Sequence, residues 1–219
     1  LVRGPTFNNI TTTYAAGWAQ GTQGQRFWGA AATNNAYEEF NDYAAEFGIG
    51  GLPILDIYLA HNRGVGFALM TNYIGSDGLG NIIASGLYES DTFGDFDFMD
   101  QLYATAGGIT AAGISGLMPD VMIGTDFNVS DDHRALVFHE FAHASLFLNV
   151  GPTWWEQLAT AEIVADNETG FAWGNATSMG AGRIALAESW AEHIGDIFAD
   201  RKYGANVSNQ NGATFLARL

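Results

Sequence analysis

The stretch Val137-Phe138-His139-Glu140-Phe141-Ala142-His143 decides the interpretation of this chain. It lies in a strongly signalled helix, because Ser130 is a good N-cap residue, two aspartates follow it in the first turn, and Gly151 can end the helix. Histidines four residues apart leave the same helix face about one turn from each other, so both imidazoles can bind one ion. Glu140 is rotated by roughly 100° from His139 and can reach a water molecule on that ion without being a ligand. The pattern therefore predicts a metal centre.

The alternative is a pair of core histidines whose ring nitrogens bond to backbone carbonyls, with Glu140 in solvent. The histidine face also carries apolar residues, namely Ala135, Leu136, Ala142, Leu146 and Val150. Both imidazoles therefore point into the protein interior, and two interior histidines beside a carboxylate favour the metal site.

A catalytic zinc ion takes three protein ligands, so a third ligand is expected elsewhere in the chain. Glu188 and Glu192 lie four residues apart in a later predicted helix, on a face with small residues that would let this helix approach the histidine helix closely. Buried carboxylates are costly without a cation or hydrogen-bond donors. We therefore assign Glu188 as the third ligand and Glu192 as an acceptor for a histidine ring N–H. Two alternatives stay open: both carboxylates lie in solvent, or His193 is the third ligand.

The rest of the chain predicts an α+β fold, with strands early and helices late. Before the histidine motif, the sequence predicts a helix from about Ala30 to Phe47 and strands over 52–59, 65–70 and 119–124. After it, helices are expected over about 153–165 and 183–203, joined by a glycine-rich loop. We expect one domain over 1–219, with a mixed helix and sheet lobe over about 1–150 that includes the histidine helix. A helical lobe over 151–219 then carries the third ligand.

The composition excludes several classes of function. Twenty-four acidic residues against eight basic ones give a net charge of −16, which opposes binding to nucleic acid and to anionic lipid. No apolar run approaches the roughly 18 residues that a membrane-spanning helix needs. Cysteine is absent, so thiolate metal sites and cysteine nucleophiles are excluded. The acidic composition, rich in Asn, Thr and Gly, favours an exported bacterial protein that is secreted, periplasmic or on the cell surface.

His139-Glu140-x-x-His143 followed by Glu188-x-x-x-Glu192 resembles the gluzincin group of zinc metallopeptidases, in which two histidines and a downstream glutamate bind zinc. The segment from Ala187 to Gly195 is similar to one in exported zinc-protease-like proteins of Bacteroidetes-type bacteria. The resemblance implies a zincin-like fold, Zn2+ as the cofactor, and a peptide or protein as the substrate. It also implies peptide-bond hydrolysis, with Glu140 as the general base.

The sequence leaves parts of the mechanism open. The predicted strand Val121, Met122 and Ile123 suits an edge that holds an extended substrate, as in zincins generally. The loop over 170–182 is a candidate substrate wall, and a second oxyanion donor has four candidates: His133, Arg183, His193 and Tyr203. The alternative function is a secreted binding or surface protein with a structural or vestigial zinc site, and hydrolysis of a non-peptide amide is a third possibility. Glu140 favours catalysis, because a structural zinc site does not need it.

Overall fold

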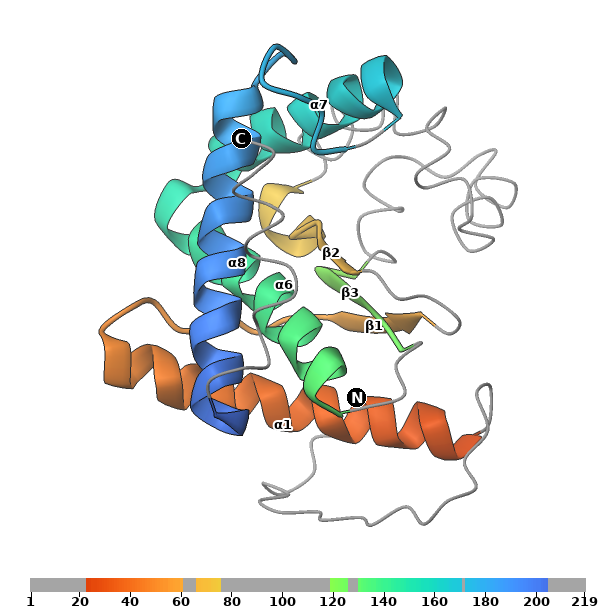
Figure 1. Cartoon of the computed structure of the whole chain (residues 1–219), viewed down its shortest axis with the longest axis vertical. Coiled ribbons are helices and arrows are strands. Elements are labelled where there is room, and N and C mark those ends of the chain that lie inside the picture. Colours follow the sequence, from red (N-terminus) through yellow and green to blue (C-terminus); the bar gives the residue numbers. More distant parts are fainter. Residues whose placement is uncertain (1–22, 61–65, 76–118, 126–129, 171, 205–219) are drawn as a thin grey trace.

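The computed structural model describes residues 23–60, 66–75, 119–125, 130–170 and 172–204, and in this part the fold is α+β, mostly helical with a small mixed sheet (Figure 1). The elements in chain order are α1 (Gln23–Phe47), β1 (Ile57–Ala60), β2 (Gly66–Ala68), β3 (Val121–Gly124), α6 (Ser130–Val150), α7 (Pro152–Thr169) and α8 (Ala181–Tyr203). The expected α+β class is thereby confirmed. None of the helices described is long and apolar enough to cross a membrane.

Most predicted elements lie where the sequence indicates, but their ends differ. Helix α6 runs from Ser130 to Val150, as the capping pattern predicts. Helix α1 begins at Gln23, a full turn or more before the predicted start, and α7 continues to Thr169. Strand β1 is only four residues long, because residues 49–56 before it are not part of a strand. The segment 76–118, which showed no clear pattern, lies outside the described residues.

The three strands form a sheet of order β1-β3-β2. β1 pairs in parallel with β3, with Ile57 opposite Val121, and β2 pairs antiparallel with β3, with Gly66 opposite Ile123. β3 is therefore the central strand, and all four of its residues are buried. The prediction that Val121, Met122 and Ile123 form a substrate-binding edge is wrong, because neighbouring strands already occupy the hydrogen-bonding groups on both sides of β3.

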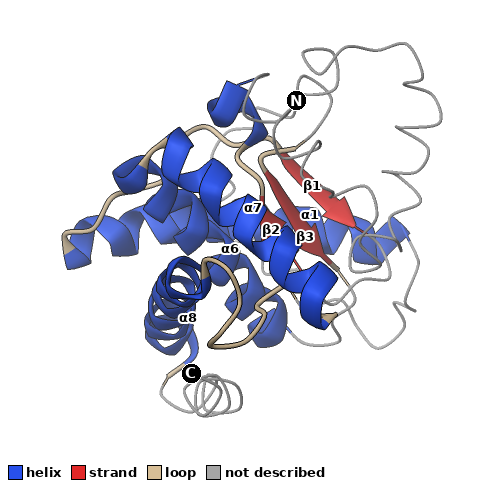
Figure 2. Ribbon diagram, turned by 90° about the horizontal axis from the view of Figure 1, so that it is seen from above, coloured by secondary structure: helices blue, strands red, loops and turns tan. Residues whose placement is uncertain are grey.

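The sheet, α6 and α8 follow one another as layers, so that α6 has the sheet on one side and α8 on the other (Figures 1 and 2). Helix α1 crosses below them and packs against α6 and β1. Four fully buried phenylalanines join the three long helices: Phe40 of α1, Phe138 and Phe141 of α6, and Phe198 of α8. The rings of Phe40 and Phe198 are 4.8 Å apart between centroids and meet edge to face. This core fixes α8 against α6 at one end of the pair.

Two ion pairs that share Glu39 also join these helices at the surface of the core. Arg134 of α6 bonds to Glu39 of α1, whose other carboxylate oxygen accepts from Lys202 of α8 at 2.6 Å. Trp190 of α8 donates its indole N–H to the carbonyl oxygen of Ala142 in α6, at 3.1 Å. Since α6 and α8 are tied together along their length, side chains on their facing sides have defined positions.

Candidate metal centre

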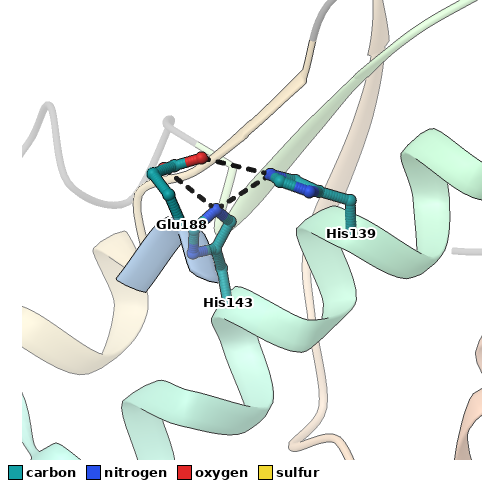
Figure 3. Close-up of side chains that lie close together, drawn as sticks. All are labelled: His139, His143 and Glu188. Atoms are coloured by element: carbon teal, nitrogen blue, oxygen red, sulfur yellow. Dashed lines mark hydrogen bonds and ion pairs between the residues drawn. The ribbon is translucent and has the colours of Figure 1, made fainter. Parts of the chain in front are cut away.

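Three side chains from two helices meet between α6 and α8 (Figure 3). The Nε2 atoms of His139 and His143 are 3.2 Å apart. Oε2 of Glu188 lies 3.5 Å from Nε2 of His139, and its Oε1 lies 3.4 Å from Nε2 of His143. One ligand atom from each residue thus falls within a group no wider than 4.8 Å, and this group could hold a metal ion.

The size of the group fits a small divalent cation. Ligand atoms about 2.05 Å from a tetrahedral zinc ion lie about 3.3 Å from one another. The contacts are close to this value: the two Nε2 atoms are 3.2 Å apart, Oε2 of Glu188 is 3.5 Å from His139, and the other oxygen, Oε1, is 3.4 Å from His143. Two imidazole nitrogens, in the unprotonated form that binds a metal, and a carboxylate also match the donor set of zinc.

Glu140 lies beside this group with its carboxyl buried. The residue is only 3% exposed, and Oε2 has no hydrogen-bond partner among the described residues. Burial raises the pKa of the Glu140 carboxyl, and the nearby imidazoles of His139 and His143 oppose that rise. A buried carboxylate without a donor needs a partner that the protein itself does not supply, such as a water molecule or a substrate N–H.

The charges in the metal-free centre stabilise one another. Burial lowers the pKa of His139, but hydrogen bonds to Glu188 and Glu192 outweigh it and raise the pKa to about 10. Burial alone would raise the pKa of Glu188, but the charge of His143 and hydrogen bonds to both histidines hold it well below its usual range. Glu188 is therefore ionised and His139 protonated at neutral pH, so a cation that binds here must displace a proton.

The outer ring nitrogens of the two histidines have different surroundings. Oε2 of Glu192 lies 3.4 Å from Nδ1 of His139, where an acceptor would fix the ring of a metal-binding histidine. Nδ1 of His143 is buried and has no hydrogen-bond partner among the described residues. The ring of His143 is instead held by Trp155 of α7, which meets it edge to face at 6.1 Å between centroids. Trp155 in turn donates its indole N–H to the carbonyl oxygen of Ala68 in β2, at 3.2 Å.

A glycine allows the two helices to come close at the centre. A Cβ atom on Gly195 of α8 would lie 3.1 Å from the backbone nitrogen of His139 and 3.2 Å from its Cα. These distances are shorter than ordinary carbon contacts of about 3.5–4.0 Å. The small residues Ala187 and Ala191 of α8 are also fully buried. The close approach predicted for this helix pair is therefore present, and it brings Glu188 within reach of both histidines.

Glu162 is a further carboxylate near the centre, and the sequence analysis did not identify it. It lies on α7 seven residues after Trp155, which is two helical turns along the same face. Burial raises its pKa well above the usual value, and the charges of Glu188 and Glu140 raise it further. The seven-residue spacing from Trp155 was visible in the sequence, but nothing there showed that this face of α7 turns toward the histidines.

The other residues considered in the sequence lie apart from this group. His193 is exposed, so the alternative that it is the third ligand is wrong. His133 is buried beside Thr33, and burial lowers its pKa to about 4. Arg183 bonds to Gln157, and Tyr203 donates to the carbonyl oxygen of Ser130. The four candidate oxyanion donors are therefore not brought to the centre.

The glycine-rich loop stays a predicted substrate wall, and its described apolar side chains are open to solvent. In it Trp173 and Met179 are 54% and 57% exposed, and Phe171 lies outside the described residues.

Comparisons of this chain with family models, with curated proteins and with solved structures find no match. The geometry of the centre is thus the basis for any statement about function.

Proposed function

We propose that this protein is a zinc-dependent hydrolase of peptide bonds, of the gluzincin type. His139, His143 and Glu188 would hold the ion, and the observation that carries the proposal is the buried carboxyl of Glu140 beside these three ligands, whose Oε2 has no hydrogen-bond partner among the described residues. A structural zinc site is satisfied by its ligands alone and has no need of such a group. A hydrolytic site does need one, because the attacking water must lose a proton.

In the proposed reaction, the ion, Glu140 and Glu192 have different roles. Zinc, when bound, would lower the pKa of a water molecule toward about 7 and polarise the scissile carbonyl. Glu140 accepts the proton of the attacking water and then delivers it to the leaving amine. Its raised pKa suits both steps, because the carboxylate is more basic than one in solvent and its acid form is a usable donor. Glu192 orients the ring of His139 through Nδ1.

Two substitutions test these roles. Glu140→Gln keeps the shape of the side chain but cannot accept a proton, so it should retain one zinc ion per chain and lose cleavage by a factor on the order of 10²–10⁴. His143→Ala removes a ligand and should lose both zinc and cleavage. The assay is metal analysis of the purified protein together with cleavage of a peptide library, with and without a chelator.

The outcomes separate the proposal from its alternative. Cleavage by Glu140→Gln at the wild-type rate would show that Glu140 is not the general base. A wild-type protein that holds zinc and cleaves no peptide would favour a non-catalytic binding or surface protein, or hydrolysis of a different amide.

A further inference from the structure

Gly66 of strand β2 lies directly against the side chain of Glu140. A Cβ atom placed on Gly66 would lie 2.7 Å from Cγ of Glu140 and 2.9 Å from its Oε1. It would also lie 2.9 Å from the carbonyl oxygen of Met122 in β3. Real carbon contacts are about 3.5 Å or longer, so the Glu140 side chain occupies space that any other residue at position 66 would fill.

The backbone of Gly66 does not explain the glycine. Its φ angle is outside the left-handed region, unlike those of Gly48 and Gly75, which are 70° and 76°. Gly66 lies in a paired strand opposite Ile123, where a glycine has no side chain to pack and weakens the strand. The two groups that crowd this position are the side chain of Glu140 and the backbone carbonyl of Met122, and Glu140 is the one that carries a proposed catalytic role.

We infer that Gly66 is a positioning residue: because it has no side chain, its backbone packs directly against the side chain of Glu140 and sets where the carboxyl lies. The inference rests on the proposed function, because it concerns the base of that reaction. Oε2 of Glu140 accepts no hydrogen bond from the described residues, so no such bond fixes the position of this oxygen. The strand on one side and the helix on the other therefore set where its oxygens stand relative to His139 and His143. A methyl group at position 66 pushes Cγ of Glu140 away by about 0.8 Å, since its contact of 2.7 Å has to open to an ordinary one, and the carboxyl that Cγ carries is displaced with it.

The contact itself is tested by a double-mutant cycle that needs no activity. Urea unfolding is measured on metal-free wild type, Gly66→Ala, Glu140→Ala and the double variant. Gly66→Ala should lower the folding equilibrium constant roughly 5- to 100-fold more when residue 140 is glutamate than when it is alanine. The cost of approaching the Met122 carbonyl is present in both backgrounds and cancels. Equal costs in the two backgrounds overturn the inference. If Gly66→Ala does not fold, the double variant should regain folding, and its failure to do so counts equally against the inference.

Positioning is tested by the split between kinetic constants. In the zinc-loaded protein, Gly66→Ala should lower kcat on the order of 10²-fold, as a misplacement of about 1 Å does, with KM and zinc content unchanged. The matched control is Gly50→Ala, whose Cβ would meet the amide nitrogen of Asn149 in α6 at an ordinary 3.7 Å and should leave kcat unchanged. A wild-type kcat in Gly66→Ala refutes the positioning role. If the wild type itself cleaves nothing, the proposed function fails, whereas the unfolding cycle still decides whether Gly66 places Glu140.

Discussion

Replacing Gly195 by alanine perturbs the metal centre without touching a ligand. The new Cβ would lie 3.1 Å from the nitrogen and 3.2 Å from the Cα of His139, both of which are backbone atoms that cannot rotate away. To reach ordinary contact distances, α8 must move from α6 by about 0.4 Å at this point. Glu188 moves with α8, whereas His139 and His143 stay on α6, so the gap between the ligands opens by a similar amount.

The loss of metal affinity follows from this displacement. Zinc-ligand distances hold within about ±0.2 Å, so a shift of about 0.4 Å forces the helices or the side chains to strain when the ion binds. Changes in groups that support metal ligands typically cost 10- to 100-fold in affinity, and we expect a loss of that size for Gly195→Ala. In the metal-free protein, the gain of about 0.5–1 kcal/mol from alanine in a helix is offset by an overpacking cost of about 1–3 kcal/mol.

The same helix offers a matched control. A Cβ on Gly182 would meet no atom of the described residues within 4 Å, so Gly182→Ala should keep the zinc affinity and raise stability by about 0.5 kcal/mol. Zinc affinity is measured by competition with a chromogenic chelator, and stability by urea unfolding of the metal-free proteins. If Gly195→Ala matches Gly182→Ala in both measurements, the helices have room for the methyl group, and the close contact at Gly195 does not set the distance between the ligands.

Two further predictions follow from the titrating groups. Because the pKa of His139 is about 10 in the metal-free protein, zinc binding should release a proton, and zinc affinity should rise about tenfold per pH unit up to that pH. Calorimetry in buffers of different ionisation enthalpy measures the number of protons released. Zinc binding without proton release between pH 7 and 9 would contradict this prediction. The pKa of Glu162 in the folded state is raised above 4.5, so the folded protein holds this proton more tightly than the unfolded chain does. As the pH rises above 4.5 toward that raised pKa, the wild type should therefore lose stability relative to Glu162→Gln. Urea unfolding of both metal-free proteins at pH 4 to 8 checks this difference, and a constant difference across that range would show that the carboxyl titrates as it does in solvent.

Some features of this protein are determined by the local sequence. The spacing of His139 and His143, the cap at Ser130 and the stop at Gly151 depend only on helix geometry, and α6 follows them. Glu188 was found by the same argument, since a carboxylate on a small-residue face requires a neighbouring helix that brings a cation or donors. Periodicity within one helix is a local property, and for this reason it can be read without knowing the fold.

The arrangement between elements was decided only in the tertiary structure. The order β1-β3-β2 made the strand of Val121 central, because pairing depends on which strands meet and not on the sequence of any one of them. The packing of Gly66 beneath Glu140, and the turn of the α7 face with Trp155 and Glu162 toward the centre, have the same origin. These contacts join residues about 12 to 74 positions apart on different elements, and no pattern within one element records its partner on another.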